Sequence, residues 1–473
     1  MISPSLHPEP IRAACERRRK LAFGLTPRAI GLLVAGFFLL IPGFYVARLS
    51  YAMLVWDGLV LLAAWLDGTR LPQASLLAAE RSWSNAPALD SETEIELKIE
   101  NHGRVIVECR LTDDLPSGLS SEPVYQRLTA FPRVPARVRY RVTPRERGDW
   151  ETGWLYVRYR SPLALAERWA RAPLTQTVRV YPALRTTEEQ QIFLARSRQI
   201  DLQLRQARQR GLGRDFESLR EYREGDDLRD VCWTATARRG SLVTRQYQTE
   251  RSQAVWIVLD CGRLMRSRLA ANAGETAVEA GAVEPVHSKL DHACSTAVAL
   301  AQLALYSGDR VGLLAYGQAI QQRMLPGRGA AHLRQVIELL AQARAEAGEA
   351  DHLRATAVLN RLQPRRSLIL WVTDFAETAM RPEVIDGAMQ LLRRHVLLFV
   401  AMAQPEVDRI AAARPRNVEQ MFRATAAQEM AGRRELQLSR LREQGALTLD
   451  LDPANLASAV LNQYLTVKER AMV

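Results

Sequence analysis

The chain has 473 residues, a hydrophobic fraction of 47% and a formal net charge of +12 at pH 7. This length suits several folded domains, and the composition excludes a largely disordered chain. Arginine supplies nearly all of the positive charge, which indicates codon usage rather than a phosphate-binding surface, so we expect no nucleic-acid partner. The five cysteines are far apart and form no Cys-x-x-Cys pair. We therefore expect neither a disulfide framework nor a zinc site.

Two apolar segments near the amino terminus predict a hairpin of transmembrane helices, at about residues 29–46 and 51–66, within an anchor region 1–70. The break between them has room only for a hairpin loop. Basic residues precede the first segment, so both termini are expected on the cytoplasmic side of the inner membrane. Asp57 lies inside the second segment, where its carboxylate can pair with Arg48, face a partner helix, or lie near the outer leaflet.

Alternating apolar and polar residues predict many short strands between residues 75 and 185. Ile95, Leu97 and Ile99 alternate with charged residues, and a turn follows them. Proline and glycine separate the later strands. This pattern is typical of an antiparallel β-sandwich of the immunoglobulin-like kind, acting as a spacer or docking module.

Residues 186–250 form a charged connector. Asp226 or Asp227 is expected to cap a short helix that ends at Arg238, Arg239 and Gly240. A solvated flap over a sheet edge is an equally good interpretation of this segment.

Two apolar runs in residues 251–473 each stop at an aspartate, at Asp260 and at Asp374. Continuous apolar runs are typical of strands buried on both faces of a parallel sheet. Helical and strand patterns alternate through this region, which predicts an α/β doubly wound domain. Because parallel strands end at the same edge of a sheet, we expect the two aspartates to share one site.

The connector closely resembles the signature of domain-of-unknown-function family fifty-eight. The matching residues are Arg220, Tyr222, Gly225, Asp226, Arg229, Val231, Trp233, Ala237 and Arg238. The strand-rich region and the two leading apolar segments also resemble this family. The resemblance implies a carboxyl-terminal domain similar to a von Willebrand factor A domain. It also implies a partner, since such proteins commonly accompany MoxR-type AAA+ ATPases that assemble or activate other complexes.

Von Willebrand factor A domains usually hold a divalent cation, often Mg²⁺, through an Asp-x-Ser-x-Ser run, a threonine and a second aspartate. Asp260 and Asp374 match the two aspartates, but Gly262 and Leu264 occupy the serine positions. The candidates for the threonine position are Asp351 and Thr356. With half of the ligands missing we expect a degenerate site without a cofactor, and Mg²⁺ at the two aspartates remains the alternative.

Two carboxylates at one sheet edge repel each other unless a positive group lies between them. Arg263 lies among the lost ligand positions, and a guanidinium can bridge carboxylates. We therefore hypothesise that Arg263 replaces the metal.

The sequence contains no P-loop, no H-E-x-x-H pair and no G-x-S-x-G elbow, so no catalytic residue is predicted. We expect a membrane-anchored, cytoplasm-facing interaction protein that works with a MoxR-type AAA+ ATPase. Two other functions remain open: a hydrolase acting on an envelope or protein substrate, and a purely structural membrane scaffold that binds other membrane proteins.

Overall fold

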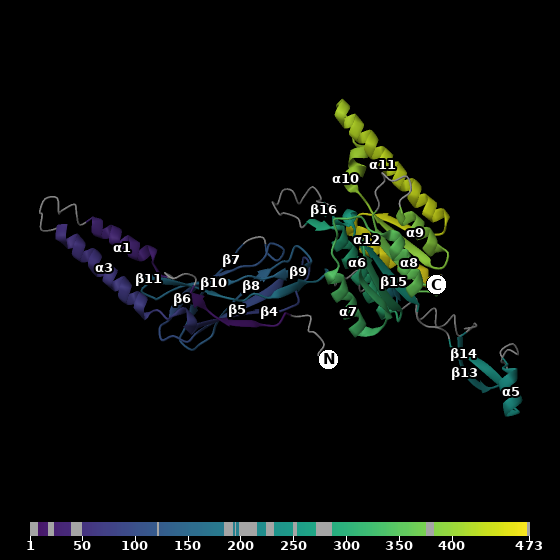
Figure 1. The fold of residues 1–473 in the computed structure, drawn as a ribbon, viewed down its shortest axis with the longest axis horizontal. Helices are drawn as coiled ribbons and strands as arrows, with labels where there is room; N and C mark the ends of the chain where they lie inside the picture. Colours follow the sequence, from purple (N-terminus) through teal and green to yellow (C-terminus); the bar gives the residue numbers. More distant parts are fainter. Residues whose placement is uncertain are drawn as a thin grey trace. The chain divides into compact units, whose positions relative to one another are not determined.

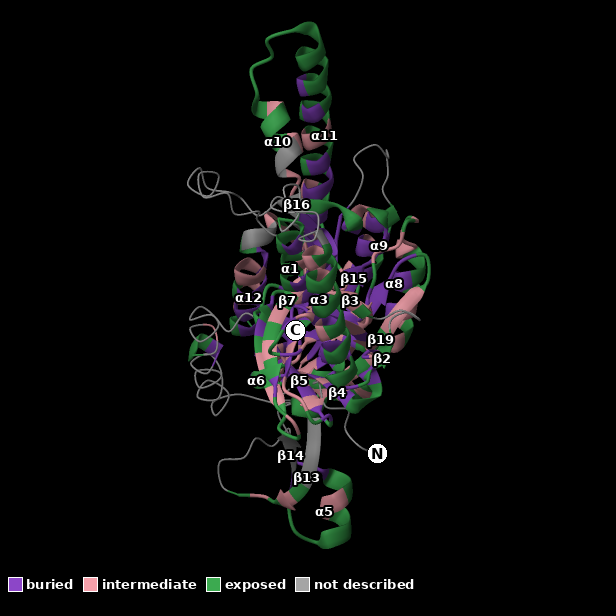
Figure 2. Ribbon diagram, turned by 90° about the vertical axis from the view of Figure 1, so that its left-hand side faces the viewer, coloured by how far each residue is buried: buried purple, intermediate pink, exposed green. Residues whose placement is uncertain are grey.

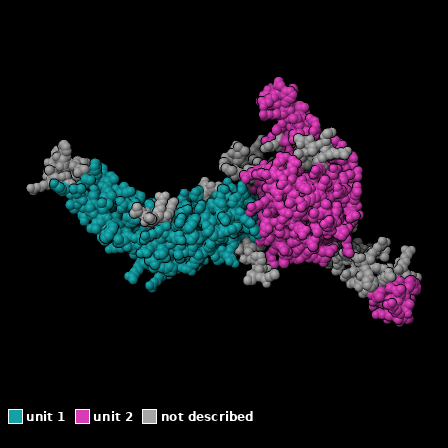
Figure 3. Space-filling view, in the orientation of Figure 1, with its two compact units in different colours: residues 1–183 teal, residues 184–473 magenta. Residues whose placement is uncertain are grey.

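The structure is a computed structural model that combines helices with several β-sheets, as the sequence predicts. It describes residues 8–17, 23–38, 50–120, 123–183, 193, 195–197, 215–223, 231–248, 253–270, 286–374 and 383–470. The chain divides into two compact units, residues 1–183 and 184–473 (Figure 3).

Unit 1 contains two antiparallel sheets that bury their facing side chains in one apolar core. The first sheet has the order β1-β4-β5-β8, with bounds Ile11–Ala14, Leu77–Trp83, Thr93–Asn101 and Ala136–Val142. The second has the order β2-β11-β10-β6-β7, with bounds Glu16–Arg17, Ala166–Ala172, Leu155–Arg160, Val107–Asp113 and Val124–Ala130. Two shorter pairings involve β3 (Phe23–Leu25), which pairs with β11, and β9 (Gly148–Glu151), which pairs with β12 (Thr177–Val180). Every second residue of β5 is buried, which confirms the predicted alternation.

A buried ion pair joins the two sheets of unit 1. Arg81 on β4 donates from Nε to Oδ2 of Asp113 on β6 at 3.1 Å, and from Nη1 to the carbonyl of Leu174 at 2.7 Å. The hydroxyl of Tyr140 also donates to Asp113. Because these polar groups satisfy one another, the core can hold them without leaving a charge unpaired.

Helices α1 (Pro27–Phe37) and α3 (Ser50–Arg70) lie side by side (Figure 1). Of the described helices, α3 alone is long and apolar enough to cross a membrane, while α1 is a shorter apolar helix. The end of the first predicted membrane segment and Arg48 lie outside the described residues. Asp57 faces α1, since a Cβ at Gly36 would be 2.4 Å from its Oδ1.

Three short strands precede α1 in a region that the sequence analysis assigned to the membrane anchor alone. β1 pairs with β4, while β2 and β3 pair with β11. The basic residues Arg12 and Arg17 therefore lie on strands of unit 1. Strands of only two to four residues are too short to be recognised from alternating apolar and polar residues.

Both apolar helices are fixed to the same turn of unit 1, between β10 and β11. Thr26, which caps α1, donates its backbone N–H to the carbonyl of Leu165 at 3.1 Å. Asp67, near the end of α3, accepts a hydrogen bond from Ser161 Oγ at 2.6 Å and from the N–H of Leu165 at 3.1 Å. A buried carboxylate held by several donors makes this end of α3 a rigid part of unit 1.

Unit 2 is built on a six-stranded sheet with the order β19-β18-β15-β20-β21-β22. In that order the strands are Ile320–Gly327, Arg310–Tyr316, Ala254–Asp260, Leu368–Thr373, Val396–Met402 and Leu447–Leu451. All neighbours are parallel except β19, which runs antiparallel at the edge. Every residue of β15, β20 and β21 is buried, as expected for strands covered on both faces.

Helices cover both faces of this sheet (Figure 1). They are α6 (Lys289–Tyr306), α7 (Gly329–Gln342), α8 (His352–Leu362), α9 (Glu383–Leu392), α10 (Pro405–Ala412), α11 (Val418–Glu443) and α12 (Pro453–Glu469). One core contains Trp256, Leu359, Trp371, Val384 and Leu438, from strands and from α8, α9 and α11. The first half of α11 and its neighbour α10 are largely exposed (Figure 2).

The connector folds into a small hairpin of β13 (Asp215–Glu221) and β14 (Val243–Gln248), with α5 (Trp233–Arg239) between them. The helix ends as predicted, with Gly240 in the left-handed region at φ 70°. Its predicted start is wrong, because α5 begins after Cys232, whose N–H is bound by the carbonyl of Val243 at 2.8 Å. The expected caps, Asp226 and Asp227, lie outside the described residues.

Candidate functional site

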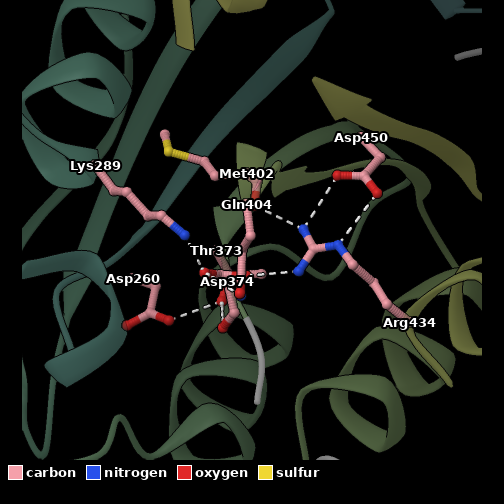
Figure 4. Close-up of polar contacts among 8 residues, drawn as sticks. All are labelled: Asp260, Lys289, Thr373, Asp374, Met402, Gln404, Arg434 and Asp450. Atoms are coloured by element: carbon pink, nitrogen blue, oxygen red, sulfur yellow. Dashed lines mark hydrogen bonds and ion pairs between the residues drawn. The ribbon is translucent and has the colours of Figure 1, made fainter. Parts of the chain in front are cut away.

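The carboxyl ends of β15 and β20 bring Asp260 and Asp374 to one edge of the sheet. The two strands pair in parallel, and both aspartates follow the last paired residues. Thr373 lies between them and donates from Oγ1 to Oδ2 of Asp260 at 2.7 Å (Figure 4). The other oxygen of Asp260 accepts the N–H of Gly262 at 2.7 Å.

Two cations approach Asp374 from opposite sides (Figure 4). Nζ of Lys289 lies 2.5 Å from Oδ2, and Nη1 of Arg434 lies 2.9 Å from Oδ1. The side chains are almost fully buried, with exposed fractions of 3% for Lys289, 8% for Arg434 and 1% for Asp374. Both oxygens of Asp374 are therefore neutralised by side chains of the same unit.

Lys289 reaches the sheet edge because of how α6 begins. Ser288 caps this helix, and its hydroxyl and backbone exchange hydrogen bonds with Asp291 in a capping box. Lys289 is therefore the first residue of the helix, where a positive charge opposes the helix dipole. The negative charge of Asp374 offsets this unfavourable position.

Arg434 connects the long helix α11 to the sheet edge. Besides Asp374 it pairs with Asp450 on β22 at 3.1 Å, and it donates from Nη2 to the carbonyl of Met402 at 2.7 Å. Burial disfavours the charged guanidinium, but the two carboxylates outweigh it and raise the pKa of Arg434. This arginine therefore stays charged and fixes α11 against two strands.

Asp260 has a different electrostatic environment from Asp374. Burial raises the pKa of its carboxyl to about 6, and the nearby charge of Asp374 adds to the effect. The hydrogen bonds from Thr373 and Gly262 act in the opposite direction. At neutral pH this carboxylate is ionised, at a cost in folding free energy.

The structure does not support the hypothesis that Arg263 lies between the two carboxylates. Its side chain is 53% exposed and pairs with Glu349 at 3.4 Å. The chain turns into a short 3-10 helix, Arg263–Arg266, directly after Gly262, and the N–H of Arg263 is bound by the carbonyl of Gly348 at 2.8 Å. This turn directs the guanidinium outward, and Lys289 and Arg434 supply the positive charge instead.

The positions expected to carry metal-binding serines cannot do so. Gly262 packs so closely that a Cβ would lie 2.9 Å from the backbone nitrogen of Ala350. Leu264 has no side-chain oxygen. The backbone of the neighbouring loop therefore closes the space that a serine at position 262 would need.

The candidates for the threonine position have other partners. Thr356 donates within α8 to the carbonyl of His352 at 2.9 Å, and Asp351 caps α8 through the N–H of Arg354 at 2.8 Å. Within the described ranges, no cluster of three or more His, Cys, Asp or Glu could hold a metal ion. Since both oxygens of Asp374 are bound by cations, these residues do not fit a divalent metal.

Sequence reasoning missed Lys289 and Arg434. One signal was available for Lys289: it is one of only four lysines in a chain rich in arginine, and it begins a predicted helix. Arg434 gave no signal, because α11 carries several arginines and nothing in their spacing distinguishes one of them.

The signature residues that the structure describes belong to the connector hairpin rather than to the six-stranded sheet. Arg220 lies on β13 and Arg238 in the last turn of α5. The N–H of Tyr222 is bound by the carbonyl of Leu242 at 2.8 Å, and Trp233 is 65% exposed. Val231 forms a bridge with Thr244 of β14, and Ala237 lies in α5. The other three signature positions, Gly225, Asp226 and Arg229, lie outside the described residues.

A family model described as "Protein of unknown function DUF58" matches residues 218–412. This match agrees with the resemblance predicted from the connector. The chain is 27% identical over 199 residues to uncharacterized proteins of Mycobacterium bovis and Mycobacterium tuberculosis, which covers 41% of this chain. It spans about half, 56%, of the length of these curated relatives.

Two solved structures match about half of the chain. The conserved hypothetical protein BatB from Bacteroides thetaiotaomicron is 13% identical with a TM-score of 0.28, over 46% of this chain and 100% of that one. Proximal thread matrix protein 1 from the mussel byssus is 12% identical with a TM-score of 0.28, over 45% of this chain and 47% of that one.

Proposed function

We propose that this protein is a membrane-anchored interaction module whose unit 2 binds a MoxR-type AAA+ ATPase or its client at the carboxyl edge of the six-stranded sheet. The observation that supports this proposal is the pairing of Asp374 with Lys289 and Arg434. An edge neutralised by its own side chains offers a fixed contact surface and leaves no open position for a metal-bound reactant.

The arrangement of the apolar helices supports anchoring through a hairpin in the inner membrane. α3 is long enough to cross the hydrocarbon layer. β3 before α1 and β4 after α3 both belong to unit 1, so the chain leaves this unit and returns to it. Two crossings would return the chain to the side from which it left, and in this proposal that side is the cytoplasm.

We also propose specific architectures for the two units. Two antiparallel sheets around one core support an immunoglobulin-like sandwich for unit 1. A mainly parallel sheet with Asp260 and Asp374 at its carboxyl edge supports a von Willebrand factor A-like domain for unit 2. Its metal-ion-dependent adhesion site is then degenerate.

A serine and histidine pair does exist in unit 2, but its position argues against hydrolysis. Oγ of Ser367 lies 3.0 Å from Nδ1 of His395, at the amino-terminal edge of the sheet. The two residues are 0% and 4% exposed, and His395 Nε2 has no hydrogen-bond partner in the described structure. A catalytic pair needs an accessible serine and an oriented base, so this pair serves packing.

The proposal is tested with the full chain in detergent and a purified MoxR-type ATPase from the same genome. Arg263 and Glu349 are exposed at the carboxyl edge, so Arg263→Glu changes the surface without disturbing the core. We expect this variant to weaken binding about tenfold or more, equivalent to about 1.4 kcal/mol. Arg366→Glu, an exposed change at the opposite edge of the sheet, is the matched control.

Three results contradict the proposal. Absence of any complex with the ATPase favours a structural scaffold. Equal loss of binding in both variants places the contact elsewhere. Turnover of an envelope or protein substrate by the isolated chain favours the hydrolase.

A further inference from the structure

Three arginines lie directly opposite one another on the outer face of the second sheet of unit 1. Register places Arg110 on β6 between Arg127 on β7 and Arg158 on β10. Cβ atoms of directly opposed residues are about 5 Å apart, and like charges at this separation destabilise a sheet. A row of this kind costs stability in the free protein, which indicates that its charge serves a ligand.

The glutamates of this face neutralise only part of the positive charge. Arg158 forms a bidentate pair with Glu167, at 2.7 and 2.6 Å. Arg160, one row nearer the apolar helices, pairs with Glu108 at 2.7 Å. Arg110 and Arg127 are exposed, and neither has a hydrogen bond or ion pair with the residues that the structure describes.

The two unpaired arginines line a pocket. Its volume is about 170 Å³, and Arg110, Arg127 and Arg160 contribute their side chains together with Thr129 and Glu108. Because Glu108 is already paired with Arg160, the remaining charge in the pocket is positive. An arginine presents several N–H donors in one plane, an arrangement that matches the oxygens of a phosphate group.

We propose that this pocket binds the phosphate group of an anionic ligand, held by Arg110 and Arg127. A second pocket extends the site toward the membrane helices: it is lined by Arg110, Arg158 and Pro27, the first residue of α1. If the helix pair is anchored as proposed above, the arginines face the phosphate layer of the cytoplasmic leaflet, which contains anionic lipids. The phosphate then comes from a lipid headgroup, and a soluble phosphate compound is the other source.

The test uses the full chain in a non-ionic detergent without phosphate. Calorimetric titrations with dihexanoyl phosphatidylglycerol and with inorganic phosphate measure the two sources separately. We expect the phosphatidylglycerol to bind, and Arg110→Ala/Arg127→Ala to weaken its binding at least about tenfold, because charge-assisted hydrogen bonds are lost. Arg110→Lys/Arg127→Lys keeps the charge but loses the planar donors, so an intermediate affinity is expected.

Arg104→Ala/Arg137→Ala removes two exposed arginines elsewhere in unit 1 and serves as the control. A second readout separates binding from misfolding: without ligand, the Arg110/Arg127 double alanine variant should unfold at the same temperature as wild type or higher, since repulsion is removed. Binding of inorganic phosphate as tightly as phosphatidylglycerol supports the site with a soluble source. The proposal is overturned if neither compound binds, or if the control variant loses as much affinity as the pocket variant.

Discussion

Lys289 and Asp374 form an ion pair that is almost completely buried, with Nζ and Oδ2 2.5 Å apart. Removing one partner of such a pair leaves a charge in a low-dielectric environment, which costs about 3–5 kcal/mol. We therefore expect Lys289→Met to lower the free energy of unfolding of unit 2 by about 3 kcal/mol, since Arg434 still compensates part of the charge. Urea unfolding followed by the fluorescence of the buried Trp256 and Trp371 measures this change.

The exposed pair of Arg263 and Glu349 is the natural comparison. Because solvent screens it, Arg263→Ala should change the free energy of unfolding by less than about 0.5 kcal/mol. Equal losses in Arg263→Ala and Lys289→Met would show that the buried cluster does not hold the sheet edge together.

The carboxyl of Asp260 should make unit 2 more stable as the pH falls. Its pKa is raised from 3.8 to about 6 in the folded state, so the folded protein takes up the proton first. Protonation of Asp260 adds about 3 kcal/mol to the free energy of unfolding below pH 4, and this contribution is lost as the pH rises to 6. Asp260→Asn cannot titrate, so the difference in unfolding free energy between wild type and variant should change across this window. A constant difference between pH 4 and 7 would contradict the raised pKa.

His352 should make unit 2 less stable as the pH falls, which is the opposite of the effect of Asp260. Burial lowers the pKa of His352 from 6.5 to about 4, and its Nδ1 forms a hydrogen bond with the hydroxyl of Tyr316 at 2.9 Å. Its contribution is complete above pH 6.5 and falls by about 3 kcal/mol as the pH drops to 4. His352→Gln retains an amide that can form a hydrogen bond with Tyr316 but does not titrate, so it should remove this acid sensitivity.

In the wild type, the effects of Asp260 and His352 on the free energy of unfolding nearly cancel between pH 4 and 6. A pH series on His352→Gln alone should therefore show stability rising toward acid, because only Asp260 remains to titrate. A wild-type protein that loses stability steeply in this window would show that His352 outweighs Asp260.

Asp67 should determine how firmly α3 is held to unit 1. Asp67→Ala leaves Ser161 Oγ and the N–H groups of Leu165 and Ala166 without their acceptor. Since an unsatisfied buried donor costs about 1–3 kcal/mol, we expect a loss of about 3 kcal/mol. Hydrogen exchange should accelerate at the amides of Leu165 and Ala166. The exposed Glu92→Ala is the control, and unchanged exchange in Asp67→Ala would contradict the attachment.

Magnesium should not stabilise unit 2. Because Lys289 and Arg434 occupy both oxygens of Asp374, millimolar Mg²⁺ should leave the unfolding temperature unchanged. Gly262→Ser, which restores one ligand position, should still bind no metal and should lose about 1–3 kcal/mol through contact with Ala350. A Mg²⁺-dependent rise in unfolding temperature that disappears in Asp260→Ala would contradict this view of the edge.

Local pattern was sufficient to predict the strands that carry Asp260 and Asp374. A buried parallel strand needs a continuous apolar run. When two such runs each end in an aspartate, the two carboxylates are predicted to lie at the same edge of the sheet. The same reasoning placed Arg263 wrongly. The direction of the Arg263 side chain depends on the turn after Gly262 and on a loop that is far away in the sequence. A local sequence pattern predicts neither the turn nor the position of that loop.

The partners of Asp374 depend on packing between distant elements. Lys289 is 85 residues from Asp374 in sequence and Arg434 is 60, and helix positions bring both to one carboxylate. The strands before α1 were missed for a related reason. β1 is too short to show a period, and its partner β4 begins only after both apolar helices.

The position of β1 has a consequence for how the protein is made. β1 leaves the ribosome before α1, but its neighbour β4 is synthesised only after α3 is complete. The first sheet therefore cannot close until both helices have been synthesised. If the helices insert into the bilayer as proposed, their insertion precedes closure of this sheet, because the amino-terminal strand can pair only with a strand that is synthesised after both helices.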